Sequence, residues 1–444
     1  MAIVHRSRAS RWVLAGALAL GVAGVPRAGW AQDQPPRPHY QGLFGSPAPA
    51  SRSLDIRWSL LGVYDDNVTA DTASYDPRLQ VNGAYGLGEA TLTYMQKTKR
   101  HQLTANGRST SRYYPQMTDL SATEGSGDLS VVTQIGRRSH VSLFQGATYQ
   151  PYYQLNFMGV AAPSEGVTIL SGNVAGSPEL GGQPLRSLPS YIYDGKFGWG
   201  TQIGRRDTLS ADYSYRHTIF GNSVRAPFDW QLAAVKFTHP MTRYAALRLG
   251  YGYSQGRSGT RVDNHNIDVG VDYSRPLSRT RRTKFNFSSG SSIVEYANQQ
   301  YFVMNGDAEL THEVGRSGTL SVGYHRGVQF VEGVIGPMMA DTVRTGFSGY
   351  LGSRVEAIIN GGYSSGQIGL GSGDPGYATY TAGAGLRVAL NRLFSIDMQY
   401  LYDQYDFDQG APLLVGVPRA LDRQSIRVGV TGWVPLLHRS SGRE

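Results

Sequence analysis

Hydrophobic and polar residues alternate one by one along most of the chain. In 208–218 the odd positions are mostly apolar or aromatic and the even positions polar, and the same pattern recurs in 243–254, 264–273, 377–390 and 393–403. A period of two is typical of a β-strand whose two faces meet different surroundings. Helical periodicity is scarce, so the pattern predicts an all-β protein.

The alternating segments are long, often ten residues or more, whereas strands of soluble sheets most often have about five or six. Strands of this length suit a tilted crossing of a lipid bilayer. Aromatic residues gather near strand ends, in 112–115, 149–153 and 400–407. Tyrosine is favoured at a membrane interface because its ring is apolar and its hydroxyl group needs water, so these residues are expected to form aromatic girdles.

The segments between strands alternate between short and long. Short connections are expected near 98–101, 136–139, 204–207, 239–243, 275–281, 315–318, 352–354 and 391–392, and longer ones near 65–78, 115–123, 154–190, 219–226, 256–261, 297–300, 332–340, 366–376 and 407–420. Together they predict a transmembrane antiparallel up-and-down β-barrel of about eighteen strands, with sixteen as the alternative. Both ends of the barrel and all short turns would face the periplasm.

A soluble sandwich or propeller is the alternative fold. It would need a second packed layer against each apolar face. Here each strand has a single apolar row, and its other row carries Gly, Ser, Thr and charges of both signs. A lipid-facing exterior and a polar lumen explain both rows, so the barrel is favoured.

The first residues resemble a secretory signal peptide. Arginines precede an apolar run at Trp12–Val25, and Gly29-Trp30-Ala31 has small residues at the positions required for cleavage after Ala31. We therefore expect a signal peptide at 1–31, a flexible leader at 32–51, the barrel at 52–434 and a C-terminal tail at 435–444. Cleavage would remove four Arg and no acidic residue from the chain's formal charge of +9, leaving 9 − 4 = +5, which gives no reason to expect a nucleic-acid partner. The sequence contains no Cys, which excludes disulfides and thiolate chemistry.

The row expected to face inward contains charged residues of both signs. In a water-filled channel such charges would set the preference for permeating ions, while the plainer alternative is that they only pair with one another. The pore-lining candidates are Asp194, Lys196, Asp212, Arg216, Arg248, Asp268, Asp272, Glu309, Glu313, Arg387, Asp397, Asp403 and Arg427. The long connection 154–190 either folds inward and narrows the pore or stays outside as a lid or plain loop.

No set of residues predicts an enzyme. Gly362-Tyr363-Ser364-Ser365-Gly366 matches the G-x-S-x-G pattern by letters, but a nucleophile elbow requires a strand, a sharp turn and a helix, and this stretch lies in a β pattern. The His residues show no metal-binding spacing, and the sequence contains no phosphate-binding loop. We expect no catalytic residue, no cofactor and no metal.

The letters QIGRR occur at Gln134–Arg138 and at Gln202–Arg206, and a similar stretch lies at Glu313–Ser317. The spacings of these stretches differ, so they do not mark a repeated module. Each one ends one alternating segment and begins the next, where glycine supplies a turn conformation that other residues avoid. The residues expected in these periplasmic turns are Gly136, Arg137, Arg138, Gly204, Arg205, Arg206, Gly315 and Arg316.

The chain resembles a loosely defined group of Gram-negative outer-membrane barrels known as β-barrel porin 2, some of which lie in exopolysaccharide gene clusters. The resemblance rests on Gly62–Val68 at the end of the first strand, and on GRR followed by an alternating strand with Tyr at Gly136–Tyr149 and Gly204–Tyr215. One departure is that many such barrels end on an aromatic residue that the assembly machinery reads, whereas this chain continues past Trp433.

Pattern and resemblance together lead us to expect a porin-like channel in the outer membrane for passive diffusion of small hydrophilic solutes or saccharides. The alternatives are an outer-membrane component of exopolysaccharide export or assembly and, less favoured, a barrel enzyme acting on lipid or glycan. The expected partners are outer-membrane lipid and lipopolysaccharide, the barrel-assembly machinery and, in the export alternative, polysaccharide-export proteins.

Overall fold

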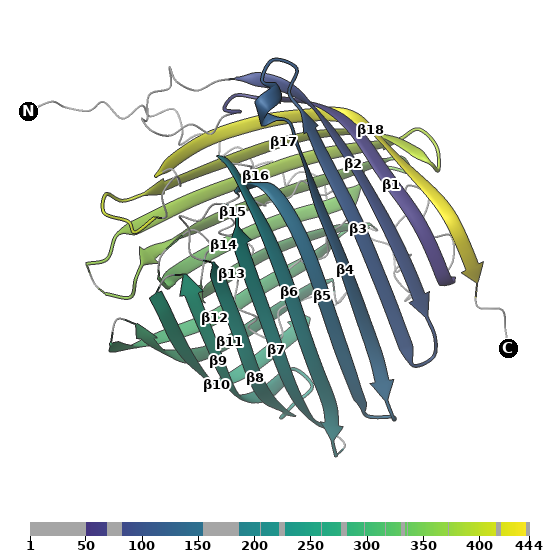
Figure 1. Cartoon of the computed structure of the whole chain (residues 1–444). Coiled ribbons are helices and arrows are strands. Elements are labelled where there is room, and N and C mark those ends of the chain that lie inside the picture. Colours follow the sequence, from purple (N-terminus) through teal and green to yellow (C-terminus); the bar gives the residue numbers. More distant parts are fainter. Residues whose placement is uncertain are drawn as a thin grey trace, which may run out of the picture. The chain divides into compact units, whose positions relative to one another are not determined.

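The structure is a computed structural model that describes residues 50–68, 82–153, 186–204, 206–221, 227–258, 260–276, 282–296, 298–315, 317–329, 334, 336–371, 373–413 and 419–440. These residues form an eighteen-stranded sheet and one short 3₁₀ helix, Thr118–Leu120 (Figure 1). The strands are β1 (Ala50–Asp65), β2 (Gly83–Lys97), β3 (His101–Tyr113), β4 (Ala122–Ile135), β5 (Ser139–Tyr153), β6 (Arg186–Ile203), β7 (Asp207–Phe220), β8 (Phe228–Pro240), β9 (Ala245–Ser258), β10 (Thr260–Pro276), β11 (Thr283–Tyr296), β12 (Gln299–Val314), β13 (Gly318–Gln329), β14 (Met338–Tyr350), β15 (Val355–Ile368), β16 (Gly376–Ala389), β17 (Phe394–Phe407) and β18 (Ala420–Ser440). No helix among the described residues is long and apolar enough to cross a membrane.

Each strand pairs antiparallel with the strands before and after it in the chain, and β1 pairs with β18. The sheet therefore closes on itself with no free edge, which confirms the predicted up-and-down barrel and its eighteen strands (Figure 1). The connections after even-numbered strands lie at one end of the barrel, here called the turn end, where β1 also begins and β18 ends. The connections after odd-numbered strands lie at the other end, the loop end.

Two connections expected to be long are tight hairpins, and those predictions were wrong. β9 reaches Ser258 and β10 starts at Thr260, with Gly256 paired to Val262. β11 and β12 are separated by two residues, of which Asn298 has a φ of 61°. The Gly, Ser, Arg and Asn residues here favour loops in isolation, but the backbone ladder continues through them.

The last strand extends further than expected. β18 continues past Val434 to Ser440 and stays paired with β1 as far as Ala50. Residues 435–440 thus belong to the barrel rather than to a separate tail. Pro435 interrupts the alternation in the sequence, and it lies beside a register shift in the β1–β18 ladder, where a residue lacking an N–H group is tolerated.

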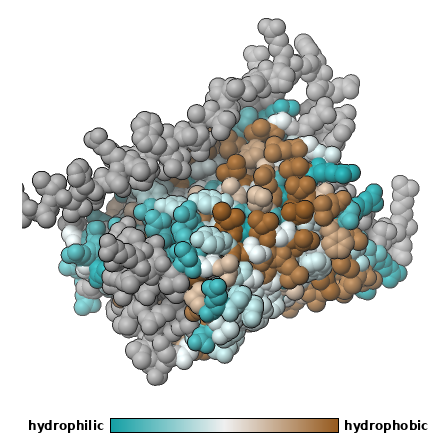
Figure 2. All heavy atoms as spheres, turned by 90° about the horizontal axis from the view of Figure 1, so that it is seen from above, coloured by the Kyte–Doolittle hydropathy of each residue, from teal (hydrophilic) through white to brown (hydrophobic). Residues whose placement is uncertain are grey.

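Large apolar side chains cover the outside of the barrel. On β10, Ile267, Val269 and Val271 are 42, 63 and 41% exposed, whereas Val262 and Asn264 on the other face are 3 and 6% exposed. Figure 2 shows a continuous hydrophobic patch on the side of the barrel. Exposed apolar rows on one face of most strands suit contact with lipid rather than with water.

Most of the described buried apolar residues form two clusters, and both clusters lie at the loop end. The smaller one joins β1 and β2 to the segment after β3 and includes Leu61, Val63, Tyr85 and Tyr114. The larger one joins strands from β7 to β18. Tyr114, Tyr405 and Phe407 belong to these clusters and are 4 to 6% exposed, so they are not part of the outer girdle as the sequence predicted. Strand alternation cannot show which end of a strand is covered by a loop.

Candidate functional site

The inner wall of the barrel carries the charged side chains that the alternation places opposite the lipid-facing rows. The strand register fixes this assignment, because paired residues in a ladder lie on the same side of the sheet. Asp194 pairs with Arg216 and Arg387 with Asp397, while the neighbouring positions Tyr193, Leu386 and others point outward and are exposed.

Three pairs of the candidate residues form ion pairs along the wall. Arg216 donates to Asp194 through Nε at 2.7 Å and through Nη2 at 3.3 Å. Arg248 donates to Asp272, with 2.5 Å between Nη1 and Oδ1. Each pair joins neighbouring strands, so the charges pair along the wall and not across the lumen.

The third pair is formed by Arg387 and Asp397, and Arg387 has Glu356 as a second acidic partner. Its Nε is 2.7 Å from Asp397 Oδ1, and its Nη1 is 3.1 Å from Glu356 Oε2. Ser395 donates a further hydrogen bond of 2.9 Å to Asp397. All three charged side chains are buried, with side-chain exposures of 4 to 11%, so this group is a rigid part of the wall.

The other candidates are distributed over the inner wall. Lys196 and Glu313 are exposed, and the Lys196 ammonium lies 5.8 Å from the centre of the Phe144 ring. Glu309 accepts a 3.4 Å hydrogen bond from Asn286. The half-buried positions that complete the set are Asp212, Asp403 and Arg427. Asp268 lies on β10 opposite Gly250, but its side chain is outside the described residues.

Sequence reasoning missed several inward-facing charges on the first strands and on β12–β14. Arg108 and Glu89 form an ion pair at 3.1 Å, and Asn106 donates to Asp128 at 2.9 Å. Arg57 and Arg344 also face the lumen, by their pairing with Thr91 and Gly362. The same alternation runs through these strands and could have identified all of them.

A second missed group lies on β11–β13. Asp307 is buried, with His325 Nδ1 2.5 Å from Oδ1 and Ser288 Oγ 3.2 Å from Oδ2. His325 and Ser288 each contact the carboxylate and not one another, so the three residues lack the chain of contacts that a nucleophilic triad needs. The G-x-S-x-G stretch lies wholly inside β15, with Ser364 hydrogen-bonded to Thr342 and Tyr377, and no turn follows Ser364.

A buried ion pair crosses the seam between β1 and β18 at which the barrel closes. Arg423 of β18 donates to Asp65 of β1 through Nε at 3.0 Å and Nη2 at 2.6 Å, and both side chains are 0–1% exposed. Asp65 also accepts a 3.0 Å hydrogen bond from the backbone of Asn67. The pair lies at the loop end beside the smaller apolar cluster.

The turn glycines adopt the conformation expected of them. Gly136, Gly204 and Gly315 have φ values of 72, 75 and 63°, in the left-handed region that side chains disfavour. Arg137, Arg138 and Arg206 are exposed beside them. Arg205 and Arg316 lie outside the described residues, as does most of the 154–190 connection.

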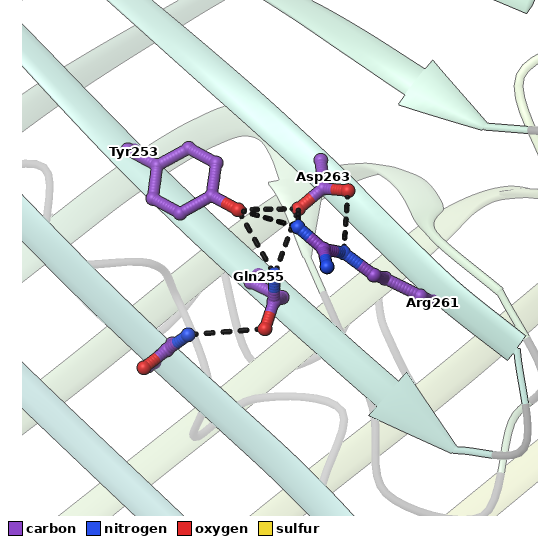
Figure 3. Close-up of polar contacts among 5 residues, drawn as sticks. Tyr253, Gln255, Arg261 and Asp263 are labelled. Carbon is purple, nitrogen blue, oxygen red and sulfur yellow. Dashed lines mark hydrogen bonds and ion pairs between the residues drawn. The ribbon is translucent and has the colours of Figure 1, made fainter.

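A polar network marks the border of the apolar exterior at the loop end. On the outward face of β9 and β10, Asp263 accepts hydrogen bonds from Tyr253, Gln255 and Arg261 at 2.5 to 3.1 Å (Figure 3). One step closer to the turn end on the same face of β9, Tyr251 is 51% exposed, followed by Leu249 at 41%. The change from apolar to ionised side chains places the edge of the lipid-facing band between these two levels.

No known protein family matches the sequence. No curated protein matches it either. Among solved structures, the fold is similar to outer-membrane porins of Pseudomonas aeruginosa. OpdQ is 10% identical over 87% of this chain and 98% of its own, with a TM-score of 0.43. OpdO is 10% identical over 90 and 100%, with a TM-score of 0.44, and OccK2 (OpdF), solved in complex with glucuronate, is 9% identical over 87 and 98%, with a TM-score of 0.44.

Proposed function

We propose that this protein is an outer-membrane, porin-like channel for passive diffusion of small hydrophilic solutes or saccharides. The observation that carries the proposal is the reversal of polarity across one wall: lipid-facing rows outside, and ionised side chains inside on strands all around the barrel. Inward-facing charges such as Lys196 and Glu313 require water, because an ionised group in a dry interior costs far more than the fold gains. A barrel of about sixteen to eighteen strands is wide enough to hold an aqueous channel.

The two sides of the inner wall differ in the charges they present. From β14 through β18 to β3 the wall is mixed: its arginines stand beside carboxylates, with Arg344, Arg387, Arg423, Arg427, Arg57, Arg108 and Arg112 alternating with Glu356, Asp397, Asp403, Asp65, Asp55 and Glu89. Carboxylates dominate from β10 to β12, at Asp272, Asp307, Glu309 and Glu313. A permeating molecule with separated polar groups would be oriented between these sides, as expected for a sieve of hydrophilic solutes.

Liposome swelling tests this function. Purified barrel in vesicles is expected to admit pentoses and hexoses and to discriminate by size against tri- and tetrasaccharides. The same protein, denatured and not refolded, serves as the control for non-specific leakage of the vesicles. Vesicles that contain folded barrel but swell no faster than empty ones in any sugar would contradict the proposal.

We also propose the membrane partners of this barrel. The apolar band would contact outer-membrane lipid, the polar edge around Asp263 would lie at the level of lipopolysaccharide headgroups, and insertion would use the barrel-assembly machinery. The exopolysaccharide role comes only from the sequence resemblance to β-barrel porin 2. Loss of polymer secretion in a deletion strain, with unchanged sugar uptake, would favour that alternative over diffusion.

A further inference from the structure

The inside of the loop end is apolar, in contrast to the charged wall closer to the turn end. Met338, Ala340 and Val294 are 0% exposed and Val334 is 2% exposed. Other members of this larger cluster are Phe220, Phe228, Val262, Val303, Val328, Ile368, Tyr377, Tyr405, Phe407, Ala411 and Leu421. Strand members such as Tyr377, Tyr405 and Phe407 occupy the same face as Arg387 and Asp397, so the cluster lies within the barrel mouth.

Two connections pack onto this layer and meet each other. Val334, between β13 and β14, forms an antiparallel bridge with Leu413, between β17 and β18. Ala411, in the same connection as Leu413, is 4% exposed. These connections start four strands apart, so the bridge spans part of the mouth instead of following the wall.

The β15–β16 connection joins the same assembly. Met338 bridges to Gly369, and the Gly369 N–H donates to the carbonyl of Pro337 at 2.8 Å. Among the described residues, each of the three connections contains a glycine with a positive φ: 112° at Gly336, 113° at Gly369 and 97° at Gly410. Such residues are suited to act as hinges, because glycine can change between backbone conformations that other residues avoid.

We propose that Val334, Met338, Ala411 and Leu413 form an apolar latch that narrows the loop end of the channel, and that current flows when Val334 and Leu413 separate. The latch rests on the proposed channel function. Hydrated solutes and ions pass an apolar constriction poorly, because water leaves it readily. Among the described residues, Val334 and Leu413 meet through one backbone bridge and apolar packing, which can be broken and remade without unpairing a barrel strand.

The absence of native Cys allows a direct test with a disulfide. The variant Val334→Cys with Leu413→Cys places two thiols at a bridged pair, where the short distance between backbones suits a disulfide. The matched control is Ser139→Cys with Thr201→Cys, a cross-strand pair on the outer face at the turn end whose hydroxyl oxygens are 2.7 Å apart. Both variants are reconstituted in planar bilayers, and the cross-link is verified by mass before current is recorded.

Oxidation of the latch variant is expected to lower the mean current by about tenfold or more, and dithiothreitol should restore it. The control variant should conduct equally in both states, and Leu413→Asp should spend more time open than the unmodified protein. If the cross-linked latch conducts like its reduced form, the latch is refuted while the channel stands. If neither the unmodified protein, the reduced variant nor Leu413→Asp conducts, the channel itself is refuted and the latch with it.

Discussion

The buried ion pair between Asp65 and Arg423 connects the first and last strands, and replacing one partner alone would leave the other charged in an apolar surrounding. Asp65→Leu leaves the guanidinium group of Arg423, which is 1% exposed, without its carboxylate partner. Arg423→Met leaves the carboxylate of Asp65, which is 0% exposed, without its guanidinium partner. Leaving one half of a buried pair uncompensated costs about 3–5 kcal/mol, whereas replacing both halves by apolar groups of similar size is often close to neutral. Each single variant should therefore lose about 3–5 kcal/mol of unfolding free energy, and the double variant about 0–2 kcal/mol.

Urea unfolding in lipid vesicles, followed by tryptophan fluorescence, measures these losses. The control is Arg261→Met, which removes a similar ion pair with Asp263 whose arginine is 62% exposed on the outer face, and it should cost under about 1 kcal/mol. The reasoning fails if Asp65→Leu and Arg423→Met are as mild as that control. It also fails if the double variant loses as much as the two single losses added together, because the pair would then have no coupling.

Three further predictions concern the turns, the exterior and the lumen. Gly204→Val places a β-branched side chain at a φ of 75° and should cost about 1–2 kcal/mol in the same unfolding assay, and an unchanged midpoint would count against a turn that requires glycine. Val269→Arg puts a charge on the lipid-facing side and should cost about 2–4 kcal/mol, while Val269→Leu should be nearly neutral; equal effects would argue against lipid contact. Arg344→Gln should raise cation preference in reversal-potential measurements and Glu309→Gln should lower it, each by about twofold, since one charge at about 10 Å in water contributes about 0.4 kcal/mol. Identical reversal potentials would show that these side chains do not face the permeating ions.

The period-two alternation predicted the strands, and the order of short and long connections between them predicted the antiparallel barrel of eighteen strands. Glycines between alternating segments likewise predicted left-handed turns at Gly136 and Gly204. Which charges pair could not be predicted, because Asp194 meets Arg216 through the register between two strands, which the pattern within each strand does not specify.

The apolar layer at the loop end was the largest feature that the sequence did not predict. Tyr405 and Phe407 have the composition of a membrane girdle, yet they face the inside of the barrel and are buried. Their surroundings come from connections such as the one containing Val334, which packs against residues far away in sequence. Alternation describes a strand and its two faces, but it contains no information about loops that return over the mouth.

Single-channel recording in planar bilayers tests the central claim most directly. The purified, folded barrel should insert in discrete steps of equal conductance, and the conductance of each step should increase with salt concentration. Leu413→Asp should raise the fraction of time the channel is open without changing its strand content. If folded protein inserts into the bilayer but neither it nor Leu413→Asp carries current at any salt concentration, the account of this barrel as a diffusion channel is contradicted.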